Sequence, residues 1–159
     1  MQTFLRSAFA TLAGLLLMSQ AVAQNPNIDC AAVTVTQSGN TFTISGKVGG
    51  LGNGNSVTVA VTGNIQGEAF CENKQGKRTS AGTPAQGAGL GSATYTAGKN
   101  GSVSFSLNIS SAEVDAALAN TGSCPSGQKK VLVYTLLSYA ISATAKDSLG
   151  NTIKVVTCP

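Results

Sequence analysis

A period of two runs through most of this 159-residue chain, and it constrains the fold more than any other feature of the sequence. Residues 102–110, SVSFSLNIS, place Val, Phe, Leu and Ile on one face of an extended strand and Ser or Asn on the other. The same alternation recurs in residues 32–37, 41–48, 56–65 and 92–97. This pattern is typical of strands that bury one face and expose the other to water. The sequence therefore predicts an all-β protein.

The remaining strands and turns suggest how the sheets are organised. Residues 130–148 are apolar nearly throughout, which predicts a central strand buried on both faces, with a bulge near Thr135 because the strand is so long. Residues 152–158 predict a final strand, and turns rich in Gly and Asn separate the strands. About seven strands joined by hairpin turns favour a two-sheet antiparallel sandwich, with a closed β-barrel as the alternative.

One segment follows a helical pattern. Within residues 110–122, Ser110 stands three residues before Glu113, which is the spacing of a capping box, and Val114 and Leu118 follow at helical intervals. Gly122 suits the position just after a helix. We expect one short helix that rests on the edge of the sandwich, because a helix of this length is not stable alone.

With these strands, turns and one helix, residues 30–158 resemble the immunoglobulin-like Greek-key and fibronectin-type-III-like sandwiches of small secreted bacterial proteins. The resemblance covers the architecture alone and implies no activity. The Trp of true immunoglobulin domains has no counterpart, since the chain contains no Trp.

The N-terminal residues predict export. Arg6 precedes a short apolar run at residues 12–18, and the small residues of 21–23, AVA, form a cleavage site, so residues 1–23 are predicted to be a signal peptide. We then expect a flexible tail at 24–29 and a single sandwich domain at 30–159. The predicted location is the periplasm, the cell surface or the extracellular space, and no later apolar run is long enough to predict a transmembrane segment.

Four cysteines, Cys30, Cys71, Cys124 and Cys158, predict two disulfides in an exported chain. Three pairings are possible. In the predicted sandwich, the last three cysteines meet at one pole and Cys30 begins at the other, so Cys30 must lie on a strand or an extension that runs differently. The preferred pairing joins Cys71 to Cys124 and Cys30 to Cys158.

The residues needed for common catalytic sites are absent from the sequence. The chain has no His, and its four Cys are assigned to disulfides, so the sequence predicts no Ser-His-Asp or Cys-His site, no metal site and no cofactor. Glu68 and Glu72 could form an acid/base pair, but the preferred interpretation is two solvated carboxylates beside a strand end. We therefore expect a protein that is not an enzyme.

Residues 72–91 show no apolar periodicity and are predicted to be a long loop that follows Cys71. Lys74, Lys77 and Arg78 gather in this loop, which makes them the candidate binding residues. The loop could contact a polyanion or occupy a trypsin-like protease as a canonical-loop inhibitor. It could also be a solvated loop whose charges only aid solubility.

From these observations we predict a secreted, non-catalytic structural or adhesive binding protein of the bacterial envelope or extracellular matrix. The loop at 72–91 is the candidate contact surface, and the expected partners are anionic polysaccharide, lipopolysaccharide or another surface polyanion. No specific nucleic-acid recognition is expected, because the mature chain carries only a mild positive charge. The alternatives are a pilus-like subunit that assembles with other copies by strand addition, and the protease inhibitor.

Overall fold

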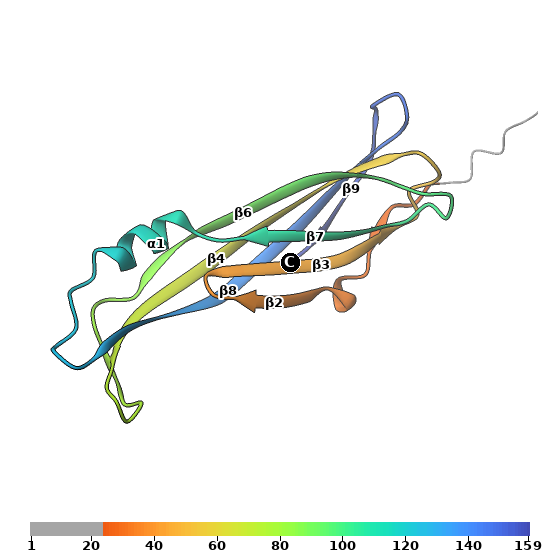
Figure 1. Ribbon diagram of the computed structural model, residues 1–159. Coiled ribbons are helices and arrows are strands. Elements are labelled where there is room, and N and C mark those ends of the chain that lie inside the picture. The colour runs from red at the N-terminus through yellow and green to blue at the C-terminus, as the bar shows by residue number, and fades with distance from the viewer. Residues whose placement is uncertain (1–23) are drawn as a thin grey trace, which may run out of the picture.

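A computed structural model describes residues 24–159 of the chain, so the predicted signal peptide at 1–23 lies outside the described residues. The chain folds into two antiparallel sheets (Figure 1). The strands remain in two separate sheets and do not close into one, which confirms the predicted two-sheet antiparallel sandwich.

The first sheet is built around β3 (Thr41–Gly49). On one side β3 pairs with β7 (Val103–Ile109), and on the other it pairs with β2 (Thr34–Ser38) and the short β1 (Asn27–Ile28). A 3-10 turn, η1 (Cys30–Ala32), connects β1 to β2.

The second sheet is larger and is built around β4 (Ser56–Glu72), which pairs along its whole length with β8 (Lys129–Lys146). On its other side β4 pairs with β6 (Ala85–Thr96) and the short β5 (Arg78–Ser80). A final strand, β9 (Thr152–Cys158), pairs with the second half of β8.

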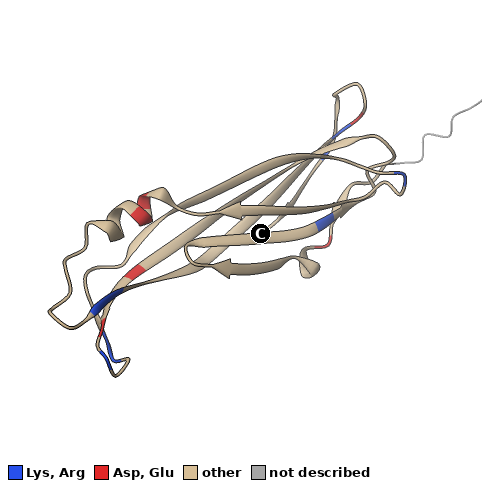
Figure 2. Cartoon of the chain, viewed as in Figure 1, with Lys and Arg blue, Asp and Glu red and all other residues tan. Residues whose placement is uncertain are grey.

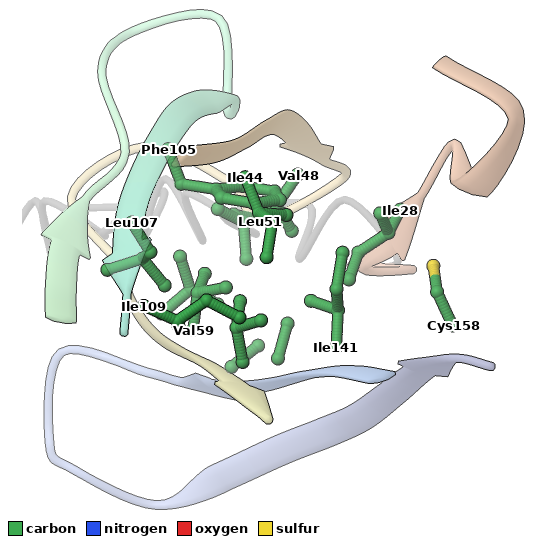
Figure 3. Close-up of a cluster of buried hydrophobic side chains, with 14 of the residues drawn as sticks. Ile28, Ile44, Val48, Leu51, Val59, Phe105, Leu107, Ile109, Ile141 and Cys158 are labelled. Carbon is green, nitrogen blue, oxygen red and sulfur yellow. The ribbon is translucent and has the colours of Figure 1, made fainter. Parts of the chain in front are cut away.

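The alternating apolar residues form the core between the sheets. Figure 3 shows Ile44, Val48 and Phe105 of the first sheet facing Val59 and Ile141 of the second. Ile44, Val48 and Val59 have no exposed surface, and burial of each such side chain contributes about 1.5–3 kcal/mol to folding. The period of two therefore predicted correctly which face of β3, β4 and β7 is buried, whereas β2, which was predicted from the same alternation, is exposed at every position.

Residues 72–91 are not the long loop that the sequence predicted. Only residues 73–77 and 81–84 lie outside strands, because β6 begins at Ala85. The inward positions of β6 include Gly87, Gly89 and Gly91, and a Cβ at Gly89 would lie 2.8 Å from Ile65 Cδ1. Over residues 87–91 the inner face of β6 has no room for apolar side chains, so this part of the strand carries no apolar periodicity, whereas Ala93 and Tyr95 further along pack against the core.

The prediction for residues 130–148, a central strand buried on both faces, is wrong: β8 buries only Ile141, Ala143 and Ala145, all on one face. Leu132 and Leu137 of β8 are 41% and 46% exposed, and among the described residues β9 pairs only with residues 141–146 of this strand. The strand does contain the irregularity expected near Thr135, and it lies at Leu137: Ser138 is opposite Asn64 and Leu136 is opposite Ile65, so Leu137 has no partner in β4.

The predicted helix is present as α1 (Ala112–Ala119), with different ends. Ser111, not Ser110, caps its N-terminus by accepting a hydrogen bond from the Val114 amide at 3.4 Å. The helix ends at Ala119 with Asn120 as its C-cap, so Gly122 lies one residue beyond the position after the cap at which it was predicted. Because Ser110 and Ser111 are adjacent and both can cap a helix, the sequence alone did not decide between them. The packing of Val114 and Leu118 against the second sheet fixes where the helix begins.

Residues 24–29, predicted as a flexible tail, pack on the domain. Ile28 pairs with Val48 in β1, and both Ile28 and Pro26 are buried. Burial of these two apolar side chains offsets the entropy lost when the tail is ordered.

Both disulfides are present, and they join Cys71 to Cys124 and Cys30 to Cys158, the pairs preferred from the sequence. Cys158 does not lie at the pole of Cys71, however. Because β9 is much shorter than β8, Cys158 is opposite Ile141, partway along β8. At this point it meets Cys30, in the segment that follows β1.

Within residues 24–159, no helix has both the length and the apolar character required to cross a membrane.

Candidate functional site

The candidate contact residues lie at one end of the second sheet, where β4 and β5 form a hairpin. Asn73 closes the turn: its side-chain Oδ1 accepts hydrogen bonds from the amides of Gln75 (3.0 Å) and Lys77 (2.9 Å). The Asn73 amide donates to the Lys77 carbonyl at 3.0 Å, and Gly76 adopts a φ of +78° that favours glycine. This hydrogen-bonded turn holds Lys74 and Lys77 at the tip of the hairpin.

Two further cations join this end because β8 starts beside the end of β4. Lys129 is opposite Glu72, and Lys130 is opposite Cys71. Figure 2 shows the resulting group of Lys and Arg residues at the end of the hairpin and the start of β8, and few charges along the body of the sheets. We call this group the basic pole; it comprises Lys74, Lys77, Arg78, Lys129 and Lys130.

Glu72 is the carboxylate of the basic pole. Its Oε2 lies 2.7 Å from Arg78 Nε, and its Oε1 lies 3.0 Å from Lys129 Nζ. The hydrogen bond from Arg78, followed by that from Lys129, lowers the pKa of Glu72 below its ordinary value. Glu72 therefore stays ionised and compensates part of the charge of Arg78 and Lys129.

The other lysines of the basic pole differ in their contacts. Lys130 Nζ donates to the carbonyls of Leu118 at 2.7 Å and Thr121 at 3.1 Å, which satisfies main-chain groups in the last turn of α1 and just after it. Among the described residues, the ion pairs include neither Lys74 nor Lys77. These two ammonium groups are the ones most available to an external anion.

An open cleft of about 490 Å³ lies between the hairpin tip and the start of β8. Lys74 and Lys129 are part of its lining, together with Glu72, Gly76 and Gly127. The Cys71–Cys124 disulfide ties the segment before β8 to the end of β4, so it fixes one side of this cleft to the other.

The sequence identified Lys74, Lys77 and Arg78 as candidates, and the structure places all three at one end of the molecule. It did not identify Lys129 and Lys130. These two lysines directly precede the strongest apolar run of the sequence, which could have drawn attention to them. Only the pairing of β4 with β8, however, brings them to the hairpin.

Glu68 and Glu72 are spaced along β4, and each has a local partner. Four residues of an extended strand span about 13 Å, which is longer than the roughly 5–9.5 Å between the two carboxylates of glycosidases. Glu68 accepts a hydrogen bond from Gln66 Nε2 at 2.7 Å, and Glu72 is paired as described above. These contacts favour the interpretation of two separate surface carboxylates.

Other chemistry-bearing groups lie apart from the basic pole. In the part of the chain that the structure describes, no three His, Cys, Asp or Glu side chains come together as a metal site. Tyr134 packs against the core, where burial, reinforced by the nearby Asp115 carboxylate, raises its pKa to about 12. Its hydroxyl therefore stays protonated at neutral pH.

Comparisons with known proteins do not assign the chain to a family. No protein-family model matches it, and no curated protein matches it. Among solved structures, it is similar to a proposed beta-galactosidase from Bacteroides fragilis, with 16% sequence identity and a TM-score of 0.22. That match covers 84% of this chain and 17% of the other, and a similarity of this size carries no argument about fold or activity.

Proposed function

We propose that this chain is an exported, non-catalytic binding protein of the cell envelope or extracellular matrix, and that its basic pole contacts an anionic polysaccharide. The observation that carries the proposal is the concentration of five cations around one carboxylate at one end of a sandwich whose other charges nearly cancel. The immunoglobulin-like resemblance belongs to this proposal, as the kind of rigid scaffold that presents such a surface.

The charge distribution over the mature sequence supports a specific role for this end. Outside the basic pole, residues 24–159 contain four cations, Lys47, Lys99, Lys146 and Lys154, and five carboxylates, Asp29, Glu68, Glu113, Asp115 and Asp147. The positive excess of the mature chain therefore comes from the basic pole alone. A cluster of this kind attracts polyanions through the summed field of its charges.

Export is supported by the two disulfides, which form and persist in oxidising compartments. The predicted signal peptide at 1–23 agrees with this location. The absence of His from the sequence and the pairing of all four Cys in disulfides leave no imidazole or free thiol for catalysis, which supports a binding role.

The contacts of the turn favour polyanion binding over protease inhibition. A protease binds its target as an extended segment, whereas the amide and carbonyl of Lys77 both bond to Asn73, and the Arg78 guanidinium is held by Glu72. Neither candidate residue presents the free main chain that an inhibitory loop requires.

The test is retention of the mature protein on immobilised heparin as a function of salt. The Lys74→Ala/Lys77→Ala/Arg78→Ala variant is expected to elute at lower salt, with a log–log salt slope reduced by about three, one for each cation removed. The matched control, Lys47→Ala/Lys99→Ala/Lys146→Ala, removes the same charge away from the basic pole and should elute close to the unmodified protein.

Two results would contradict the proposal. One is equal elution of the unmodified protein and the basic-pole variant. The other is an equal shift in both triple variants, which would show that net charge alone decides retention. Lipopolysaccharide bearing phosphate groups, compared with its dephosphorylated form, then distinguishes a phosphate ligand from a polysaccharide ligand.

A further inference from the structure

One edge of the second sheet is open. On the side away from β4, β8 pairs with β9 only at residues 141–146. Within the described residues, 129–140 of β8 have no strand neighbour on that side, and Figure 1 shows the C-terminus of β9 ending near the middle of the molecule. We call residues 129–140 the open edge.

The main chain of the open edge faces a groove. The groove, of about 690 Å³, separates the open edge from β2, and it is lined by Val35, Gln37 and Phe42 on one side and by Tyr134 to Tyr139 on the other. The Tyr134 carbonyl accepts a hydrogen bond from Gln37 Nε2 at 2.9 Å, so it points away from β4 and into this groove. Because a strand repeats every second residue, the main-chain groups of Lys130 and Leu132 point the same way.

The side chains of the open edge offer little protection against pairing. Residues 131–136, VLVYTL, contain no charge, no Gly and no Pro, and they are of types that favour strands. Leu132 is 41% exposed. Proteins usually block such an edge with Lys or Pro, and here the lysines stand only at its first two positions.

We propose that the open edge pairs with the open edge of a second copy, through residues 129–136, to form a two-fold symmetric dimer with a continuous sheet. Identical edges related by a two-fold axis pair antiparallel. This direction separates Lys129 and Lys130 of one copy from those of the other, whereas a parallel pair would place them side by side. The part used ends before the irregularity at Leu137, which interrupts regular pairing.

This arrangement differs from a filament. A two-fold interface uses the same surface on both partners and closes on itself, so the assembly stops at two copies. Pairing requires the Gln37 side chain to move, because its amide donates to the Tyr134 carbonyl, and it brings the second copy close to Pro159, which also lines the groove. The proposal shares Lys129 and Lys130 with the basic pole, but pairing uses their main chain, whereas polyanion binding uses their ammonium groups.

The experiment is sedimentation equilibrium of the mature protein over a wide concentration range, with two matched variants. Leu132→Lys places a charge on the open edge and is expected to give the mass of one chain. Leu90→Lys makes the same change on β6, at a leucine that is 70% exposed, and should keep the mass of two chains. A protein that stays monomeric at all concentrations, or a dimer that survives Leu132→Lys, would overturn the proposal.

A second measurement needs no variant. Amide hydrogen exchange of residues 130–136 is expected to slow as protein concentration rises, because the Leu132 and Tyr134 amides find a partner only in the second copy. Exchange that does not depend on concentration in this segment would refute pairing through the open edge, and slowing confined to another segment would place the interface elsewhere. Heparin retention is measured separately, so failure of either proposal is recognised on its own.

Discussion

Glycines on the inner face of the second sheet determine how closely α1 can approach it. Gly67 of β4 lies beneath the helix, and a Cβ at this position would lie 2.6 Å from Leu118 Cδ1 and closer still to Val114 Cγ1. Val114 and Leu118 have no exposed surface. The two buried side chains of the helix therefore occupy the space that the absent side chain leaves.

This contact leads to a prediction for Gly67→Ala. Replacing Gly by Ala in a strand normally stabilises by about 0.4–1 kcal/mol, because the unfolded chain loses freedom. Here the added methyl overlaps two buried side chains, and overpacking of this kind costs about 1–3 kcal/mol. We expect a net loss of stability, measured by urea unfolding.

Gly122→Ala is the matched control, since a Cβ at Gly122 would have no atom within 4 Å and its φ is not restricted to glycine. Its stability should change by less than about 0.5 kcal/mol. If Gly67→Ala were as stable as this control, the close packing of α1 on β4 would be wrong.

At the scale of elements, the sequence predicted those strands whose buried face is apolar. Residues 102–110 and 41–48 alternate because Phe105 and Ile44 fill the space between the sheets. β6 was missed over its first half because glycine fills its inward positions where the helix and Ile109 approach. The sequence does show a period of two in this part of the strand, as Gly at every second position from 87 to 91. A search for alternating hydrophobic residues does not detect this pattern.

The candidate site shows the same limit. The cations of the hairpin are neighbours in sequence and could be predicted, whereas Lys129 and Lys130 join them only through the pairing of β4 with β8. The exposure of Leu132 and Leu137 could not be predicted either, because an apolar run does not reveal which of its residues the rest of the fold covers.

Glu72 connects three elements of the basic pole, and its titration gives a second prediction. It lies on β4 and binds Arg78 of β5 and Lys129 of β8, which lower its pKa in the folded state. A carboxyl whose pKa is lower when folded stabilises the fold above its unfolded pKa, about 4.3. That contribution is lost as the pH falls through the folded value.

We therefore expect Glu72→Gln to be less stable than the unmodified protein at pH 7, and the difference to vanish in acid, below the usual range of glutamate. Urea unfolding of both proteins across this range measures the difference directly, and Glu68→Gln is the control because its carboxylate has no cationic partner among the described ion pairs. A difference that persisted in acid would mean that the role of Glu72 does not depend on its charge.

For the whole molecule, the two disulfides have different tasks. Cys30–Cys158 joins the segment after β1, in the first sheet, to β9 of the second sheet. Cys71–Cys124 joins β4 to the segment between α1 and β8, within the half of the molecule that carries the basic pole. The Cys30–Cys158 bond therefore connects the two sheets, and the Cys71–Cys124 bond fixes the end of the molecule that carries the basic pole.

The last prediction separates these tasks. The disulfides span sequence separations of 128 and 53 residues, so the chain-entropy model assigns each about 4–5 kcal/mol. Cys30→Ser/Cys158→Ser should lose about this much stability in chemical unfolding, with faster amide exchange in β9 and residues 24–32 and unchanged heparin retention. Cys71→Ser/Cys124→Ser should lose a similar amount, speed exchange in residues 119–128, and weaken heparin retention, because the cleft beside Lys74 and Lys129 is then no longer held from both sides. If the first variant weakened heparin retention as much as the second, binding would depend on the stability of the whole sandwich and not on the local arrangement of the basic pole.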